Sequence, residues 1–194
     1  MPMERKHEFK PDKPRTGWLS KLYLTQKQRS SILKWSLYAL VILLLSVVQD
    51  VVMCRLRIFG ATTELVPCGI LLVSVLVGTE RGCVFALLAS CGYLFSGSSP
   101  GVYSMVILTV LSIGAAAFRQ GYLKKGFAAN LLCVVVALLL YEMVVFAIGL
   151  FLGLTIVSRL PGFLVTTGLT ALAAPVLYAI LQAIEAIGGE SWKE

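Results

Sequence analysis

The chain has 194 residues, of which 58% are hydrophobic and only 14% are charged, and its mean hydropathy is +0.86. Soluble domains are about half apolar and about a quarter charged. The composition therefore excludes an ordinary soluble protein and predicts an integral membrane protein, and the length allows one compact bundle.

The formal net charge of +7 is concentrated near the N-terminus. Residues 1–34 contain nine Lys and Arg against three acids, whereas all later residues together sum to +1. A basic segment of this kind indicates membrane orientation and contact with anionic lipid. Since no folded basic face is evident in the sequence, nucleic acid is not an expected partner.

Residues 1–30 are predicted to form a basic cytoplasmic tail. Between Trp18 and Lys34, aromatic and aliphatic side chains are interleaved with basic ones, a pattern typical either of an interfacial helix or of a solvated linker. The side chains expected to contact lipid or a cytoplasmic partner are Trp18, Lys21, Lys27, Arg29 and Lys34.

Residues 31–187 contain six apolar segments, which predict an all-α polytopic membrane protein with about six transmembrane helices. The expected helices are Ser31–Met53, Leu65–Val77, Cys83–Phe95, Val102–Phe118, Phe127–Leu154 and Gly162–Ile187. The first has close to the ~20 residues that a bilayer core requires, whereas the second and third are short for full spans. Residues 188–194 form a short C-terminus.

The distribution of basic residues predicts the orientation of the bundle. With six crossings, 14 Lys and Arg fall on the side of the N-terminus and 3 fall on the opposite side. Because cytoplasmic loops carry the excess of Lys and Arg, both termini are expected in the cytoplasm.

Small residues occur at helical spacing in two of the apolar segments. The residues expected to support close helix packing are Gly82, Ala86 and Ser90 in the third helix and the GxxxG pair Gly149 and Gly153 in the fifth. Such residues let helix backbones approach closely, and packing is what holds helices together in lipid.

The segment Gly97-Ser98-Ser99-Pro100-Gly101 has the spacing of a hydrolase nucleophile elbow, which also needs a preceding strand and a His base. The single histidine, His7, is in the tail, so a tight interhelical turn is the better interpretation. Phosphate-binding loops, metal-ligand clusters and dinucleotide fingerprints are absent from the sequence. We therefore expect no catalytic residues, no metal, no cofactor and no enzymatic activity.

Glu142 lies near the middle of the fifth apolar segment, where a carboxylate costs roughly 3 kcal/mol or more. We expect it to face the protein interior, either as a partner, ion or ligand contact or as a structural acid bonded to a neighbour such as Tyr141. Glu64 precedes the second helix, where the helix dipole favours an acid.

Several short motifs, taken in order, resemble those of one family. They are the acid-led helix start Glu64-Leu65-Val66-Pro67, the charged turn Thr79-Glu80-Arg81-Gly82, the Ser96–Gly101 loop after an Ala/Gly-rich helix, the small-residue helix that ends at Arg119, and Tyr141-Glu142 within a long apolar helix. In these features the chain resembles, over about residues 60–185, the MreD family of bacterial rod-shape-determining membrane proteins.

The resemblance implies a six-helix protein of the bacterial cytoplasmic membrane without catalysis of its own, with a fold similar to the substrate-binding S components of energy-coupling-factor vitamin transporters. It also implies a scaffold of the elongation complex in cell-shape control. Such a scaffold binds MreC. It helps to couple MreB filaments to a SEDS glycosyltransferase with its penicillin-binding transpeptidase in peptidoglycan synthesis.

The alternative hypothesis is that the chain is itself an S component, which has the same helix count. S components typically carry an AxxxA patch on the first helix, whereas here Leu43 follows Ala39 by four residues. They also use polar side chains to hold a vitamin, and only Glu142 and scattered Ser and Thr are available. A membrane enzyme is the third and most remote hypothesis.

Overall fold

The computed structural model describes residues 26–53, 55, 61–122 and 126–187, and every regular element in these ranges is a helix. The elements are α1 (Gln26–Val48) with its π-helical continuation η2 (Gln49–Met53), α2 (Leu65–Val77), α3 (Thr79–Phe95), α4 (Val102–Tyr122), α5 (Phe127–Phe151), the 3-10 turn η3 (Val157–Arg159) and α6 (Leu160–Ile187). The predicted all-α class of polytopic membrane protein is confirmed.

Four helical stretches in the described ranges are long and apolar enough to cross a membrane: Arg29–Val52, Val102–Tyr122, Phe127–Phe151 and Val157–Ala186. The other two helices are shorter. Helix α2 has 13 residues and α3 has 17. The described residues thus form six α-helices in the predicted segments, and four of these helices have the length of a full span.

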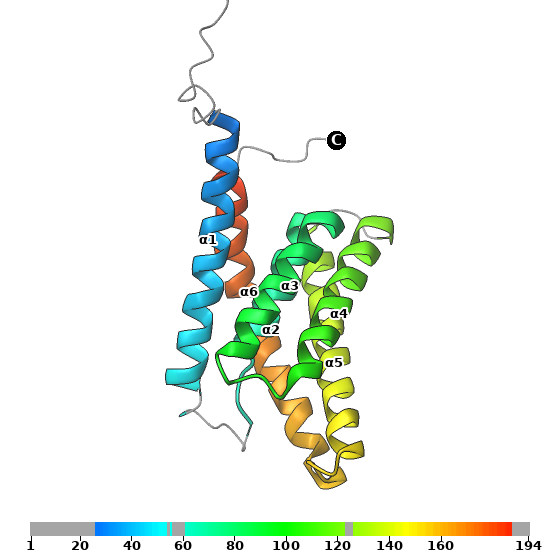
Figure 1. The fold of residues 1–194 in the computed structure, drawn as a ribbon. Helices are drawn as coiled ribbons and strands as arrows, with labels where there is room; N and C mark the ends of the chain where they lie inside the picture. Colours follow the sequence, from blue (N-terminus) through cyan, green and yellow to red (C-terminus); the bar gives the residue numbers. More distant parts are fainter. Residues whose placement is uncertain (1–25, 54, 56–60, 123–125, 188–194) are drawn as a thin grey trace, which may run out of the picture.

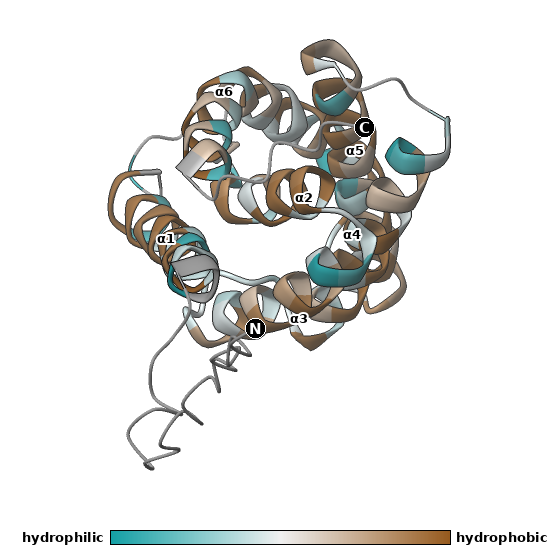
Figure 2. Ribbon diagram, turned by 90° about the horizontal axis from the view of Figure 1, so that it is seen from above, coloured by the Kyte–Doolittle hydropathy of each residue, from teal (hydrophilic) through white to brown (hydrophobic). Residues whose placement is uncertain are grey.

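Helix α2 is the centre of the bundle. Viewed from above, the other five helices surround it (Figure 2). Twelve of its 13 residues are buried. An α-helix of 13 residues is about 20 Å long, shorter than the ~30 Å hydrocarbon core, so its ends can lie at membrane depth only because other parts of the protein surround them.

Two glycines let neighbouring helices approach α2 closely. A Cβ added at Gly69 would lie 2.8 Å from Leu45 Cδ1, at the contact with α1. A Cβ at Gly82 would lie 2.9 Å from the backbone oxygen of Ser74, at the contact between α3 and α2. The turn between these two helices is a single residue, Gly78, whose φ of 101° suits glycine.

Helix α1 begins and helix α6 ends at the same end of the bundle (Figure 1). The α2–α3 turn and the end of α4 lie there too, because successive helices alternate in direction. The described basic residues at this end, which we call the basic end, are Lys27, Arg29, Lys34, Arg81 and Arg119. The opposite end has Arg55 and Arg159 among the described residues.

Several helix boundaries differ from the predicted ones. The first helix begins at Gln26 rather than Ser31 and changes to π-helical geometry at Gln49. Helix α3 starts at Thr79, four residues earlier than predicted, because Gly78 alone makes the turn. The fifth helix stops at Phe151 rather than Leu154.

Candidate functional site

Polar side chains from neighbouring helices occupy the N-terminal end of α2. The first N–H groups of a helix have no partner within it, so a buried helix start needs acceptors from elsewhere. Val66 N donates to Gln49 Oε1 at 2.9 Å, and Glu64 N donates to Thr170 Oγ1 at 3.0 Å. Gln49 is supplied by the π-helical turn η2 and Thr170 by α6, so both elements fix the position of α2.

The same polar region extends toward the α3–α4 loop through Tyr93. Gln49 Nε2 lies 3.5 Å from Tyr93 Oη, and Tyr93 Oη donates to the backbone oxygen of Ser98 at 3.3 Å. The loop itself joins two helices and has left-handed backbone at Gly97, with a φ of 80°. It is therefore the interhelical turn that the sequence predicted.

Where α5 packs on α2, Glu64, Tyr141 and Glu142 lie within electrostatic range of one another, and we call these three residues the acidic cluster. Glu142 is 4% exposed and Tyr141 is fully buried, and electrostatic interactions connect all three side chains. Tyr141 Oη and Glu64 Oε2 are buried without a hydrogen-bond partner in the described part of the chain. Buried polar atoms of this kind are rare in proteins, and they mark places where water, an ion or a ligand group can bind.

The chemistry of the acidic cluster is that of an acceptor-rich site. Two carboxyl groups and a phenol can accept hydrogen bonds from a cation or an amine. In the ranges that the structure describes, no group of three or more His, Cys, Asp and Glu side chains has an arrangement suited to a metal ion.

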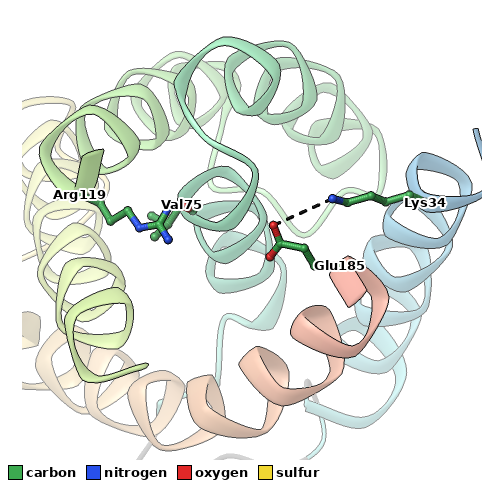
Figure 3. A network of polar contacts seen from close by, with 4 residues as sticks. All are labelled: Lys34, Val75, Arg119 and Glu185. Atoms are coloured by element: carbon green, nitrogen blue, oxygen red, sulfur yellow. Dashed lines mark hydrogen bonds and ion pairs between the residues drawn. The ribbon is translucent and has the colours of Figure 1, made fainter. Parts of the chain in front are cut away.

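A second polar network closes the C-terminal end of α2 (Figure 3). Arg119 Nη1 donates to the backbone oxygen of Val75 at 3.0 Å, and Arg119 Nε donates to Asn130 Oδ1 at 2.9 Å. Asn130 Nδ2 in turn donates to Tyr178 Oη at 3.2 Å. A guanidinium at this position stabilises the negative end of the helix dipole and satisfies a carbonyl that would otherwise be buried alone.

An ion pair joins the first and last helices beside this network. Lys34 Nζ lies 4.0 Å from Glu185 Oε1, and Lys34 also lies over the ring of Tyr38 at 5.9 Å from its centroid. Lys34 was predicted to contact lipid or a cytoplasmic partner, whereas the structure directs its amine to α6. Arg29 is exposed at the start of α1.

The other predicted lipid-contact residues fall outside what the structure describes. Trp18 and Lys21 precede the described ranges, and only the backbone of Lys27 is described, in α1.

The small residues of α3 point into the bundle. Ala86 is fully buried, and Ser90, at 1% exposure, lies with its Oγ 3.3 Å from Thr109 Oγ1 of α4. Together with Gly82, these residues form the side of α3 that packs against α2 and α4.

Gly149 and Gly153 have a different role from the helix packing that the sequence predicted. A Cβ at Gly149 would lie 3.2 Å from Thr155 Cγ2, in the turn that follows the helix. Gly153 lies beyond the end of α5 with a φ of 69°. Left-handed glycine just past a helix end is typical of a C-terminal cap, so this pair ends α5 and turns the chain toward η3.

A groove runs between α1 and α3 on the outer surface of the bundle, with a volume of about 1040 Å³. We call it the lateral groove. Its walls are mainly apolar and include Leu43 and Val47 from α1 and Val84 and Leu88 from α3. Asp50 lies at one end, and Glu80 and Arg81 lie at the basic end.

Aromatic contacts hold the two walls together near the basic end. The ring centroids of Trp35 and Phe85 are 5.8 Å apart, and Tyr38 contacts both rings. These contacts therefore fix the separation of the two walls near the basic end.

Gln49, Asn130 and Tyr178 were not predicted as functional residues from the sequence, and Arg119 was predicted only as a helix end. Gln49 and Asn130 are 6% and 3% exposed, although each is an amide within or beside an apolar segment. An amide at such a position is costly without partners, and that is the signal that could have identified both residues as interior caps.

Comparison of the chain with protein-family models, with curated proteins and with solved structures finds no match. The resemblance to the MreD family therefore rests on the sequence features alone.

Proposed function

We propose that this chain is a non-enzymatic scaffold of the MreD kind in the bacterial cytoplasmic membrane, with both termini in the cytoplasm. In this function it binds MreC and helps to connect MreB filaments with the peptidoglycan-synthesising glycosyltransferase and transpeptidase of the elongation complex. The observation that carries the proposal furthest is the lateral groove, an apolar surface feature as long as the helix that forms one of its walls. A scaffold needs such a surface for contact with other membrane proteins.

The hydrogen bonds of the interior polar side chains also support a structural function for the protein. Gln49, Thr170 and Arg119 each bond to the backbone at one end of α2. These bonds hold a short central helix in place, so that the surrounding helices present fixed surfaces to their neighbours.

The proposal is tested by co-purification from native membranes in a mild detergent. The full chain carries a C-terminal affinity tag, and mass spectrometry quantifies the proteins that accompany it, with an unrelated tagged membrane protein of similar size as the control. The expected result is enrichment of MreC and of the elongation synthases over the control. Enrichment of ATPase subunits with a transmembrane coupling protein, and no MreC, would contradict the scaffold proposal.

The acidic cluster favours a second candidate, a substrate-binding S component. Its unpartnered Tyr141 Oη and Glu64 Oε2 are what an interior ligand site would supply. Mass spectrometry of small molecules released from the purified protein tests this candidate, with the Tyr141→Phe and Glu142→Gln variants as comparisons. A bound vitamin that is lost in both variants would establish it, whereas equal small-molecule content in all three proteins would exclude the acidic cluster as a binding site.

A further inference from the structure

The dimensions of the lateral groove are those of a membrane span. On α3 its lining extends from Glu80 to Ser96, a rise of about 24 Å, and on α1 and η2 it extends from Trp35 to Asp50, about 22 Å. Its volume of about 1040 Å³ is spread along this length. The groove therefore has room for one side of a second helix along its whole length.

The polarity of the lining residues varies along the groove as expected for a site that holds a membrane-spanning segment. Charged side chains occur only at its two ends, at Asp50 and at Glu80 and Arg81. Between them the walls are apolar except for Ser46, and each wall also presents a small residue, Ala39 on α1 and Gly92 on α3. Small residues let a neighbouring helix backbone come close, which is the main source of helix association in lipid.

The carboxyl group of Asp50 requires a hydrogen-bond donor or a cation from whatever occupies the groove. Its Oδ1 atom is buried and has no hydrogen-bond partner among the residues that the structure describes. An acid at the edge of the membrane interior pairs with a cation or a hydrogen-bond donor in most membrane proteins. An occupant that carries such a donor at the level of Asp50 would complete the groove, and this requirement favours a protein side chain over a lipid acyl chain.

We propose that the lateral groove is the docking site for one transmembrane helix of a partner protein, which packs a small-residue face against Gly92 and places a basic or amide side chain opposite Asp50. This inference rests on the proposed scaffold function and names the surface that performs it. The other end of the docked helix lies beside Glu80 and Arg81 at the basic end.

Photo-crosslinking locates the partner. A benzophenone amino acid replaces Leu43 or Leu88 in the groove, or Val106 or Val110 on the exposed side of α4 as controls. These four side chains are similarly exposed, at 63%, 65%, 61% and 61%. The expected result is an adduct with one transmembrane segment at both groove positions and at neither control position. Adducts with lipid alone, or equal adducts at all four positions, would overturn the proposal.

A matched pair of glycine variants tests whether the groove must be open. Gly92→Leu fills the groove, whereas Gly114→Leu adds the same side chain to α4 away from it. A Cβ at either glycine meets no atom within 4 Å, so both variants are expected to fold. We expect Gly92→Leu to lower the recovery of the crosslinked partner about 5-fold or more and Gly114→Leu to leave it unchanged. Equal recovery in the two variants would overturn the proposal.

The requirement for a donor is tested with Asp50→Leu and Asp50→Asn. The asparagine variant keeps a hydrogen-bond acceptor and is expected to retain more of the crosslink than the leucine variant. If MreC co-purifies with the unaltered chain but crosslinks only outside the groove, the docking site is wrong and the scaffold function stands. If the groove crosslinks a helix of another protein and MreC is not recovered, the docking site stands and the scaffold function is wrong.

Discussion

At the scale of single residues, polar side chains inside this bundle make hydrogen bonds to the backbone at the two ends of α2. Arg119 bonds to the backbone oxygen of Val75 while Gln49 accepts from Val66 N. Each bond connects α2 to a different neighbour, so a single substitution affects the contact between two helices. These positions are where stability is most sensitive to a change of one side chain.

Arg119→Met is expected to destabilise the protein by about 1.5–3 kcal/mol, the usual range for hydrogen bonds to a charged group. The substitution keeps much of the side-chain volume but leaves the Val75 carbonyl and Asn130 Oδ1 without their donor. Thermal unfolding in detergent measures the effect, with the exposed Arg29→Met as the control. Equal midpoints for the two variants would show that the cap contributes no stability.

Gly82→Ala is expected to lower the unfolding temperature, because its Cβ would lie 2.9 Å from the backbone oxygen of Ser74. Overpacking against backbone usually costs about 1–3 kcal/mol. Gly114→Ala is the matched control, since it adds a methyl group in open space and should be neutral or stabilising by up to about 1 kcal/mol. An unfolding temperature for Gly82→Ala at or above that of the control would contradict the close approach of α2 and α3.

At the scale of helices, the central place of α2 determines the arrangement of the rest. Its segment is apolar on all sides, and a helix of that kind must be covered by protein or lipid on every face. The structure covers it with protein, which leaves exposed apolar faces on α1, α3, α4 and α5 for lipid. The surrounding helices thus separate α2 from the membrane.

Thiol labelling of the native protein in detergent tests the burial of α2. Cys68 on α2 is fully buried, whereas Cys83 on α3 is partly exposed. We expect a maleimide to modify Cys83 and to leave Cys68 unmodified until the protein is unfolded, as followed by peptide mass spectrometry. Modification of both cysteines at the same rate would place α2 at the surface.

The positions of the helices were largely predictable, because each long apolar run has to be satisfied by internal hydrogen bonds in lipid. The predicted bounds of the second helix, Leu65 and Val77, are those of α2. Its place at the centre was not predictable, since an apolar helix without a polar face fits a lipid-exposed position equally well. The change to π-helical geometry at Gln49 depends on tertiary contacts and also left no signal in the sequence.

The candidate sites were predictable only in part. Glu142 and Tyr141 stood out because a carboxyl group within an apolar run is costly, and in the structure both lie within electrostatic range of Glu64. The lateral groove could not be predicted, because it depends on how α1 and α3 lie beside one another, which the sequence of neither helix specifies. The GxxxG spacing at Gly149 and Gly153 was misleading, since the same residues also end helices.

At the scale of the whole molecule, the distribution of charge and the alternation of helices agree. The start of α1 and the end of α6 lie at one end, and Lys34 and Glu185 pair there. Five described basic residues lie at this end and two at the other. This bias supports a cytoplasmic location for the basic end.

Cysteine accessibility in intact cells tests that orientation. In a chain whose own cysteines are replaced by alanine, Pro100→Cys lies at the opposite end and Glu80→Cys at the basic end, and both positions are exposed. A membrane-impermeant maleimide is expected to label Pro100→Cys in intact cells and Glu80→Cys only after permeabilisation. The reverse pattern would invert the orientation and with it the proposed cytoplasmic contacts.

The most direct test of the scaffold function is a binary binding measurement. The chain and MreC are co-expressed in a membrane that contains no other elongation protein, extracted in mild detergent, and separated by size-exclusion chromatography with mass measurement of each peak. The scaffold function predicts one complex that contains both proteins in a fixed ratio. Separate elution of two stable proteins would contradict it.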